Sequence, residues 1–206
     1  SKVLNQEMID QAADLFKVDR GWIECAKPHP YLTHNFYKRP EKFIEFLEDI
    51  LTSGSDLTGV VFTSGAPGSG HHADTFILLE ETFEFSPDNY LTRYYILDNW
   101  YFNYGKSRAY LVACVAAAWR KNVYIHGRRV SKDFVRKYQF GENLLSPDLT
   151  EYWAGVHWHP EDMALDPRRL IEGLPEQHDK EVAMDLYLGL CKADKRFSLE
   201  EMDSVF

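Results

Sequence analysis

The sequence has few cysteines, no long apolar run and no amino-terminal signal pattern. Its three cysteines, Cys25, Cys114 and Cys191, are odd in number, widely spaced and form no CxxC pair. This argues against a disulfide framework and indicates reduced thiols. No run of about 18 apolar residues could form a membrane-spanning helix, and no charged-then-apolar segment opens the chain. The sequence therefore predicts a soluble cytoplasmic protein that does not bind membranes.

Internal repeats and low-complexity segments are also absent from the sequence. Hydrophobic residues make up 45% and aromatic residues 15% of the 206 positions, which is enough for a core and excludes global disorder. The length suits one large domain. We divide it into an amino-terminal helical segment (1–57), an α/β core (58–160) and an acidic carboxyl-terminal helical extension (161–206), which together form one globular unit.

Basic residues are concentrated in one part of an otherwise acidic chain. The stretch from Lys106 to Lys137 holds nine of the 23 lysines and arginines and a single acid, Asp133. Its net charge of +8 lies within a chain of −9, so the remaining residues carry −17. Such a local positive field is typical of a site that holds a small anionic ligand. The alternative is a set of solvated helix faces paired with acidic segments elsewhere.

The hydrophobic pattern predicts alternating helices and strands. Helices are expected at 5–16, 40–52, 109–119, 130–140, 181–192 and from Ser198, and strands at 60–64, 73–85, 91–101, 123–126 and 152–159. The first three strands form an antiparallel meander. The expected fold class is therefore α/β (α+β), with a central mixed, mostly antiparallel sheet, flanking helices and helical additions at both ends.

A glycine turn leads into the apolar helix 109–119. The residues of this turn, Gly105, Lys106, Ser107 and Arg108, follow the third strand directly. A helix amino terminus offers unpaired backbone N–H groups and the positive end of the helix dipole. The sequence therefore predicts that these four residues bind an anion.

A second glycine-rich segment, at 65–72 (GAPGSGHH), is close to a phosphate-binding loop. His71 and His72 stand where that loop requires lysine and a hydroxyl residue, so it lacks the fixed cation and the magnesium ligand. A hairpin loop between two strands is the simpler interpretation.

Two histidines in the predicted strand 152–159 suggest a metal site. His157 and His159 point to the same side of a strand and could ligate a divalent metal with one or two further ligands, such as His71 or His72. The pattern resembles the His-hydrophobic-His motif of rolling-circle nickases, for which Tyr187 would be the nucleophile. An edge strand with two exposed histidines is the alternative. The net charge of −9 argues against broad affinity for nucleic acid.

Residues 58–159 resemble the GNAT family of acetyl-CoA-dependent N-acyltransferases. That family has a strand meander, a glycine turn, a helix, a strand and a helix ending in Phe-Tyr-x-Lys-x-Gly-Phe. Here the last helix reads Phe134-Val-Arg-Lys137-Tyr-Gln-Phe140, in which valine replaces the tyrosine and Gln139 the glycine. The turn motif of the family is only partly matched by 104–109.

The resemblance implies acyl transfer from acetyl-CoA or another acyl-CoA to an amine acceptor, with no metal. Asp98 would be the general base and Tyr138 the acid, with Glu80, Glu81 and His126 as reserve bases. A bulge within 94–100 would supply a backbone N–H to the oxyanion. The turn residues Gly105, Lys106, Ser107 and Arg108 would hold the pyrophosphate, and Arg128, with Arg129 or Lys132, the adenosine phosphate.

Two other functions stay open at this point. One is a metal-dependent phosphodiesterase or nickase that uses His157 and His159. The other is a non-catalytic partner-binding protein on a transferase-like fold, which the incomplete turn motif favours.

Overall fold

A six-stranded mixed sheet forms the centre of the protein. The computed structural model describes residues 5–65, 73–145 and 155–199. The strands are β1 (Thr33–Asn35), β2 (Asp56–Thr63), β3 (Asp74–Ser86), β4 (Asn89–Tyr101), β5 (Ile125–Arg129) and β6 (Val156–Trp158). They lie in the order β1-β4-β3-β2-β5-β6. Strands β2, β3 and β4 form an antiparallel meander, β5 and β6 are antiparallel, and the pairs β1–β4 and β2–β5 are parallel. The predicted fold class is confirmed.

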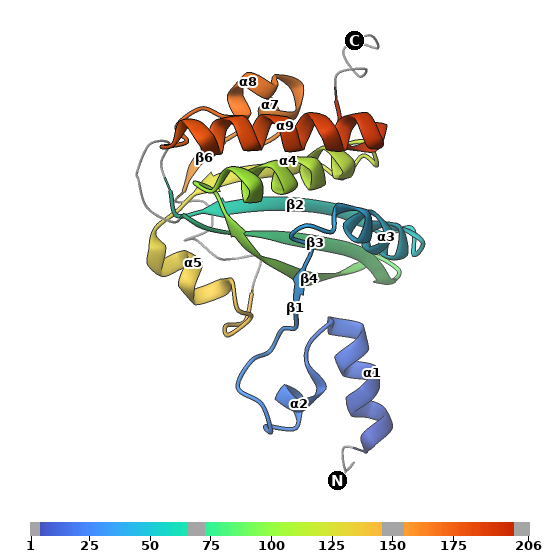
Figure 1. Cartoon of the computed structure of the whole chain (residues 1–206). Coiled ribbons are helices and arrows are strands. Elements are labelled where there is room, and N and C mark those ends of the chain that lie inside the picture. Colours follow the sequence, from blue (N-terminus) through green and yellow to red (C-terminus); the bar gives the residue numbers. More distant parts are fainter. Residues whose placement is uncertain (1–4, 66–72, 146–154, 200–206) are drawn as a thin grey trace.

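Helices cover both faces of this sheet (Figure 1). One face is covered by α3 (Pro40–Leu51), α4 (Gly105–Trp119), α7 (Asp162–Leu165), α8 (Pro167–Leu170) and α9 (Gln177–Ala193), followed by a short 3-10 helix (Lys195–Phe197). The other face is covered by α5 (Lys132–Tyr138). At the amino end, α1 (Gln6–Phe16) and α2 (Arg20–Ile23) lie beyond β1, below the sheet in Figure 1.

Side chains that alternate between the two faces of the sheet form two hydrophobic clusters, one on each face. In β2, Val61 packs with the helices of the α4 face, whereas Val60 and Phe62 pack with α5. Successive strand residues point to opposite faces, so a strand that is apolar at consecutive positions has both faces buried. The central strands therefore lie between two layers of helices.

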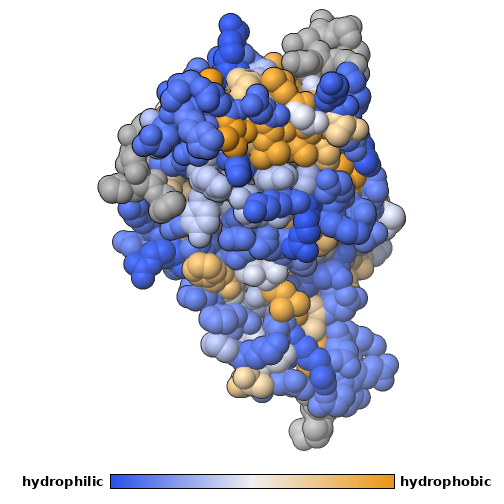
Figure 2. Space-filling model, viewed as in Figure 1, coloured by the Kyte–Doolittle hydropathy of each residue, from blue (hydrophilic) through white to orange (hydrophobic). Residues whose placement is uncertain are grey.

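The most buried helix is α4, because its residues are apolar on every side. It begins at Gly105, four residues earlier than predicted. A Cβ atom at Gly105 would lie 2.3 Å from the carbonyl oxygen of Asp179, so α9 packs directly against this end of α4. Figure 2 shows hydrophobic residues gathered at the level of α4 and α9, above a mostly hydrophilic lower part of that face.

Some elements differ in their bounds from the prediction. Strand β5 starts at Ile125 and not at Val123, since the N–H of Val123 donates to Ala118 at the end of α4. The 3-10 helix ends before Ser198, and residues 200–206 lie outside the described part. Of the predicted strand 152–159, residues 155–159 are described, and Val156–Trp158 form strand β6.

A bulge interrupts the pairing of β3 with β4. The register shifts between Thr75 and Ile77, so that Asp98 and Asn99 together lie opposite Phe76. Asn99 has a φ of 74°, a left-handed conformation that asparagine tolerates. The bulge therefore lies within 94–100, the segment in which a bulge was predicted.

Both outermost strands of the sheet, β1 and β6, are three residues long. Within the described residues, no helix is both long and apolar enough to cross a membrane.

Candidate functional site: an arginine-lined cavity

A cavity of about 250 Å³ lies where β5 and β6 meet α7, α8 and the amino end of α4. We call it the arginine cavity. Its lining residues are Phe102, Arg108, Arg129, Trp158, His159, Asp162, Met163, Arg169 and Glu172. The arginines therefore come from three separate parts of the chain.

Arg108 is the most deeply buried charged group in this cavity, with 1% of the residue exposed. Its Nε donates to the carbonyl of Phe102 at 2.6 Å, and its Nη1 donates to the carbonyls of Leu170 at 2.9 Å and Glu172 at 2.7 Å. Its Nη2 has no hydrogen-bond partner among the described residues. These carbonyls fix the guanidinium in place and leave one of its nitrogens available.

Arg108 lines the cavity together with two acids, Asp162 and Glu172. No carboxylate of the described residues forms an ion pair with this guanidinium, and burial lowers its pKa to about 10. The group therefore stays positively charged at neutral pH. Burying a cation costs several kcal/mol. The hydrogen bonds to the three carbonyls offset this cost, and a bound anion would offset it further.

Two further N–H donors of the cavity lack a partner among the described residues, the indole Nε1 of Trp158 and the Nε of Arg129. The Trp158 ring packs edge-on against Phe102, with centroids 5.1 Å apart. The Arg129 guanidinium lies 5.9 Å from the Trp158 ring. Three N–H donors, two of them cationic, thus belong to side chains that line one small cavity.

Gly127 makes room for Trp158. Gly127 lies opposite Trp158 in the pairing of β5 with β6, and a Cβ atom at Gly127 would lie 2.4 Å from the Trp158 ring. The indole therefore lies across the β5 backbone, and this position requires glycine at Gly127.

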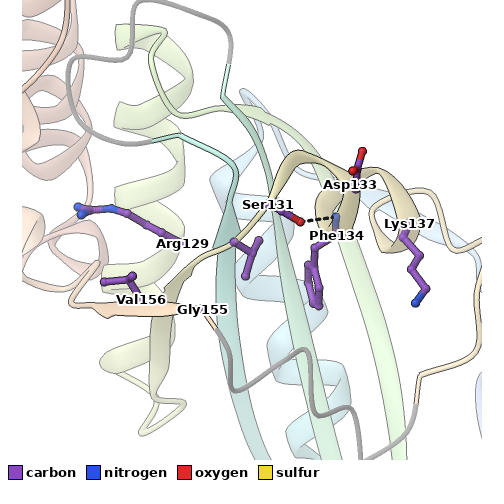
Figure 3. A pocket seen from close by; sticks show the side chains of 8 residues that line it. Arg129, Ser131, Asp133, Phe134, Lys137, Gly155 and Val156 are labelled. Carbon is purple, nitrogen blue, oxygen red and sulfur yellow. Dashed lines mark hydrogen bonds between the residues drawn. The ribbon is translucent and has the colours of Figure 1, made fainter.

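Arg129, and not the predicted Arg128, lines the cavity. Successive residues of β5 point to opposite faces, so Arg129 shares a face with Gly127. Figure 3 shows its side chain directed away from α5, toward the helices of the other face. Arg128 donates from Nη1 to the carbonyl of Gly155 at 3.2 Å. The sequence analysis named Arg128, with Arg129 or Lys132, as phosphate-binding residues, and strand parity separates the two arginines.

The other predicted anion-binding residues do not line this cavity. Gly105 is covered by the backbone of α9, and Lys106 is exposed. The hydroxyl of Ser107 accepts a hydrogen bond from the N–H of Tyr101 at 2.8 Å. Of the four turn residues, Arg108 alone lines the arginine cavity.

The predicted acid–base pair lies on the other side of the sheet. Tyr138 is 2% exposed and packs against Phe134, with ring centroids 4.8 Å apart. Asp98 is half-buried at the bulge, on the face of β4 that carries Tyr94 and Ile96, and burial raises its pKa. In addition, β3 and β2 lie between β4, which carries Asp98, and β5.

The reserve base Glu81 is committed to a buried network. It accepts the Nε and Nη2 of Arg93 at 2.6 and 2.8 Å and the hydroxyls of Tyr95 at 2.6 Å and Ser55 at 2.8 Å. Burial raises its pKa, but these hydrogen bonds and the Arg93 charge prevail and lower it to about 2. A carboxylate that is so weakly basic holds the sheet together and takes up no proton at neutral pH.

Three histidines line up along β5 and β6. The rings of His157 and His159 are 4.5 Å apart and those of His126 and His157 are 6.0 Å apart. His159 shares a 3.0 Å hydrogen bond with Glu161. Burial and the neighbouring His159 and Arg128 lower the pKa of His157. Among residues 5–65, 73–145 and 155–199, no group of three or more such side chains is arranged to hold a metal ion.

The metal and nickase interpretation names three further residues. His71 and His72 lie outside the described residues. Tyr187 is buried, and its hydroxyl donates to the carbonyl of Phe197 at 2.9 Å.

A larger cavity of about 490 Å³ lies between α5 and β6 (Figure 3). The hydroxyl of Ser131 accepts the N–H of Phe134 at 3.1 Å and caps α5. Lys137, on the same helix, points away from Arg129 in Figure 3. Arg129 and Lys137 both line this cavity, but their side chains are directed away from each other.

Comparisons with models of protein families, with curated proteins and with solved structures find no significant match for this chain. Its function must therefore be inferred from the residues that line its cavities.

Proposed function

We propose that the protein binds a small anionic molecule in the arginine cavity, through a phosphate or carboxylate group. The observation that carries this proposal is the buried guanidinium of Arg108, which has no acidic partner among the described residues. An anion in the cavity would supply the missing counter-charge. It would also accept hydrogen bonds from Nη2 of Arg108, Nε of Arg129 and Nε1 of Trp158.

The residue types of the cavity suit this chemistry. A guanidinium presents planar N–H donors that match the oxygens of phosphate and carboxylate groups. The carbonyls of Phe102, Leu170 and Glu172 hold Arg108 in one orientation before a ligand arrives, so little conformational entropy is lost on binding. A volume of about 250 Å³ suits a small anion or the anionic end of a larger molecule.

Acyl-CoA stays a predicted ligand, because its phosphates are anions of this kind. Acyl transfer would further require a base near the bound thioester, and Asp98 and Tyr138 lie on the α5 face. The cavity by itself supports binding of an anion. Titration with acetyl-CoA tests whether acyl-CoA is one of the anions that bind.

Calorimetry and thermal unfolding in the presence of inorganic phosphate, citrate and acetyl-CoA test the proposal. An anion that binds the folded state raises Tm in a concentration-dependent way. We expect this rise in the unmodified protein and a loss of most of it in Arg129→Gln. Lys106→Gln is the matched control, since it removes one positive charge from an exposed position. Equal responses of the two variants, or no heat and no Tm shift with any of the anions, would refute the proposal.

A further inference from the structure

A separate cavity of about 490 Å³ lies between the amino-terminal part of the chain and the sheet. It is lined by α1, β1, α3 and the paired strands β3 and β4. None of its lining residues belongs to the arginine cavity. We call it the aromatic cavity.

Three rings form one wall of the aromatic cavity. The centroids of His34 and Phe46 are 4.7 Å apart, those of Phe46 and Tyr95 are 5.5 Å apart, and those of His34 and Tyr95 are 6.3 Å apart. The Tyr95 hydroxyl is used by Glu81, so the ring of Tyr95 and not its hydroxyl is available to a ligand. This wall is therefore aromatic.

The charges of this cavity leave one carboxylate in excess. Glu81 neutralises Arg93 through two hydrogen bonds, and Lys17 pairs with Asp14 at 2.5 Å. Asp49 is exposed and forms no ion pair with any described residue. The aromatic cavity therefore has a net charge of −1 when His34 is neutral, and burial lowers the pKa of His34, which favours its neutral form.

The excess carboxylate lies beside the aromatic wall. Asp49 follows Phe46 by three residues in α3, so both side chains lie on one face of that helix. His34, on β1, forms no hydrogen bond with any described residue, and its neutral imidazole can accept one. A carboxylate, a ring face and a hydrogen-bond acceptor thus surround the same space.

We propose that the aromatic cavity binds an organic amine with a single positive charge and an apolar body. The ammonium group would pair with Asp49 and lie near the face of Phe46, an arrangement in which a carboxylate and a ring quadrupole both attract a cation. The apolar body would pack against Tyr95 and Phe46. An anion of the same shape would be repelled by Asp49 and would find Arg93 already occupied by Glu81.

Three probes of similar shape and different charge test this inference: phenylethylamine, phenylethanol and phenylpropionate. Binding is followed by NMR through the imidazole signal of His34 and the ring signals of Tyr95. We expect the amine to bind at least about threefold more tightly than the alcohol, and the carboxylate to bind most weakly. The order is measured at constant ionic strength.

Substitutions in α3 test whether Asp49 and Phe46 cause the preference for the amine. Asp49→Asn is expected to abolish the preference for the amine over the alcohol, and Phe46→Leu to weaken the amine at similar apolar volume. Glu45→Gln is the matched control, because it removes an exposed carboxylate of α3 that pairs with Lys42 and does not line the cavity. The inference is overturned by tighter binding of the carboxylate, by an unchanged preference in Asp49→Asn, or by no binding of any probe. These outcomes are independent of the response to phosphate.

Discussion

The Nε of Arg108 donates to the carbonyl of Phe102 at 2.6 Å, and the same guanidinium lies 4.2 Å from the centroid of the Phe102 ring. One residue thus provides both a hydrogen-bond acceptor and a π-face for a cation that has no carboxylate partner among the described residues. Through its bonds to the carbonyls of Phe102, Leu170 and Glu172, the Arg108 side chain connects α4 to the end of β4 and to α8.

Replacing Arg108 should destabilise the protein and also weaken the proposed anion binding. In Arg108→Met, three carbonyls lose a charged donor, and we expect the free energy of unfolding to fall by about 2–4 kcal/mol. Urea unfolding in phosphate-free buffer measures this change. Lys106→Met, at an exposed position of the same helix, should change it by less than about 0.5 kcal/mol. A variant of Arg108 as stable as the unmodified protein would contradict the structural role.

Gly127→Ala should disturb the arginine cavity without changing any of its charges. The new methyl group would meet the Trp158 ring, so the indole and β6 must move. We expect a loss of about 1–3 kcal/mol in stability and a weaker response to phosphate. Urea unfolding measures the change in stability, and the thermal shift with phosphate measures the change in binding. Near-ultraviolet circular dichroism reports on the five tryptophans, of which Trp158 is the one that the new methyl group meets. Unchanged results in all three measurements would show that the indole does not need this glycine.

Gly189→Ala should have the opposite effect on stability. Gly189 lies inside α9, and a Cβ atom there would have no heavy atom within 4 Å. Alanine restricts the unfolded chain and favours the helix, so we expect a gain of about 0.5–1 kcal/mol. Thermal unfolding measures the gain, and the affinity for phosphate should not change.

Glu81→Gln should reduce the stability and its dependence on pH. The pKa of Glu81 falls from 4.5 to about 2 on folding. Its ionised form therefore stabilises the fold above pH 4.5, and this contribution is lost as the pH falls from about 4.5 to about 2. At neutral pH the contribution is about 3 kcal/mol.

Unfolding curves between pH 2 and pH 7 measure this effect, because the stability changes between the pKa values of the folded and unfolded states. The slope below pH 4.5 should be smaller in Glu81→Gln than in the unmodified protein. Glu84→Gln, at an exposed position of the same strand, should keep the original slope. An identical slope in all three proteins would contradict the assigned role of Glu81.

The meander of β2, β3 and β4 could be predicted from sequence because these strands are long and regularly patterned. The three-residue strand β1 was not predicted, because a segment this short carries little pattern. Consecutive apolar residues such as Val60, Val61 and Phe62 indicate a strand buried on both faces, and the structure confirms this. The order of the strands could not be predicted, since nothing local in β5 indicates that it pairs with β2 and not with β4.

The sequence indicates the basic residues of the candidate site but not their geometry. The excess of basic residues between Lys106 and Lys137 indicated an anion, and Arg108 was among the predicted residues. The selection of Arg129 over Arg128 depends on strand parity. The predicted strand ended at His126, whereas β5 runs from Ile125 to Arg129, so the prediction left both arginines outside the strand. The carbonyls of Leu170 and Glu172 come from a segment more than 60 positions away, and backbone groups carry no sequence signal.

The short outer strands affect how this protein meets other copies of itself. A sheet ending in a long, straight strand presents a row of backbone donors and acceptors on which a second chain can grow. Here β1 and β6 each present three residues, whereas the 13-residue strands β3 and β4 lie inside the sheet. The segments with the greatest capacity for intermolecular strand exchange are thereby kept out of reach while the chain remains folded.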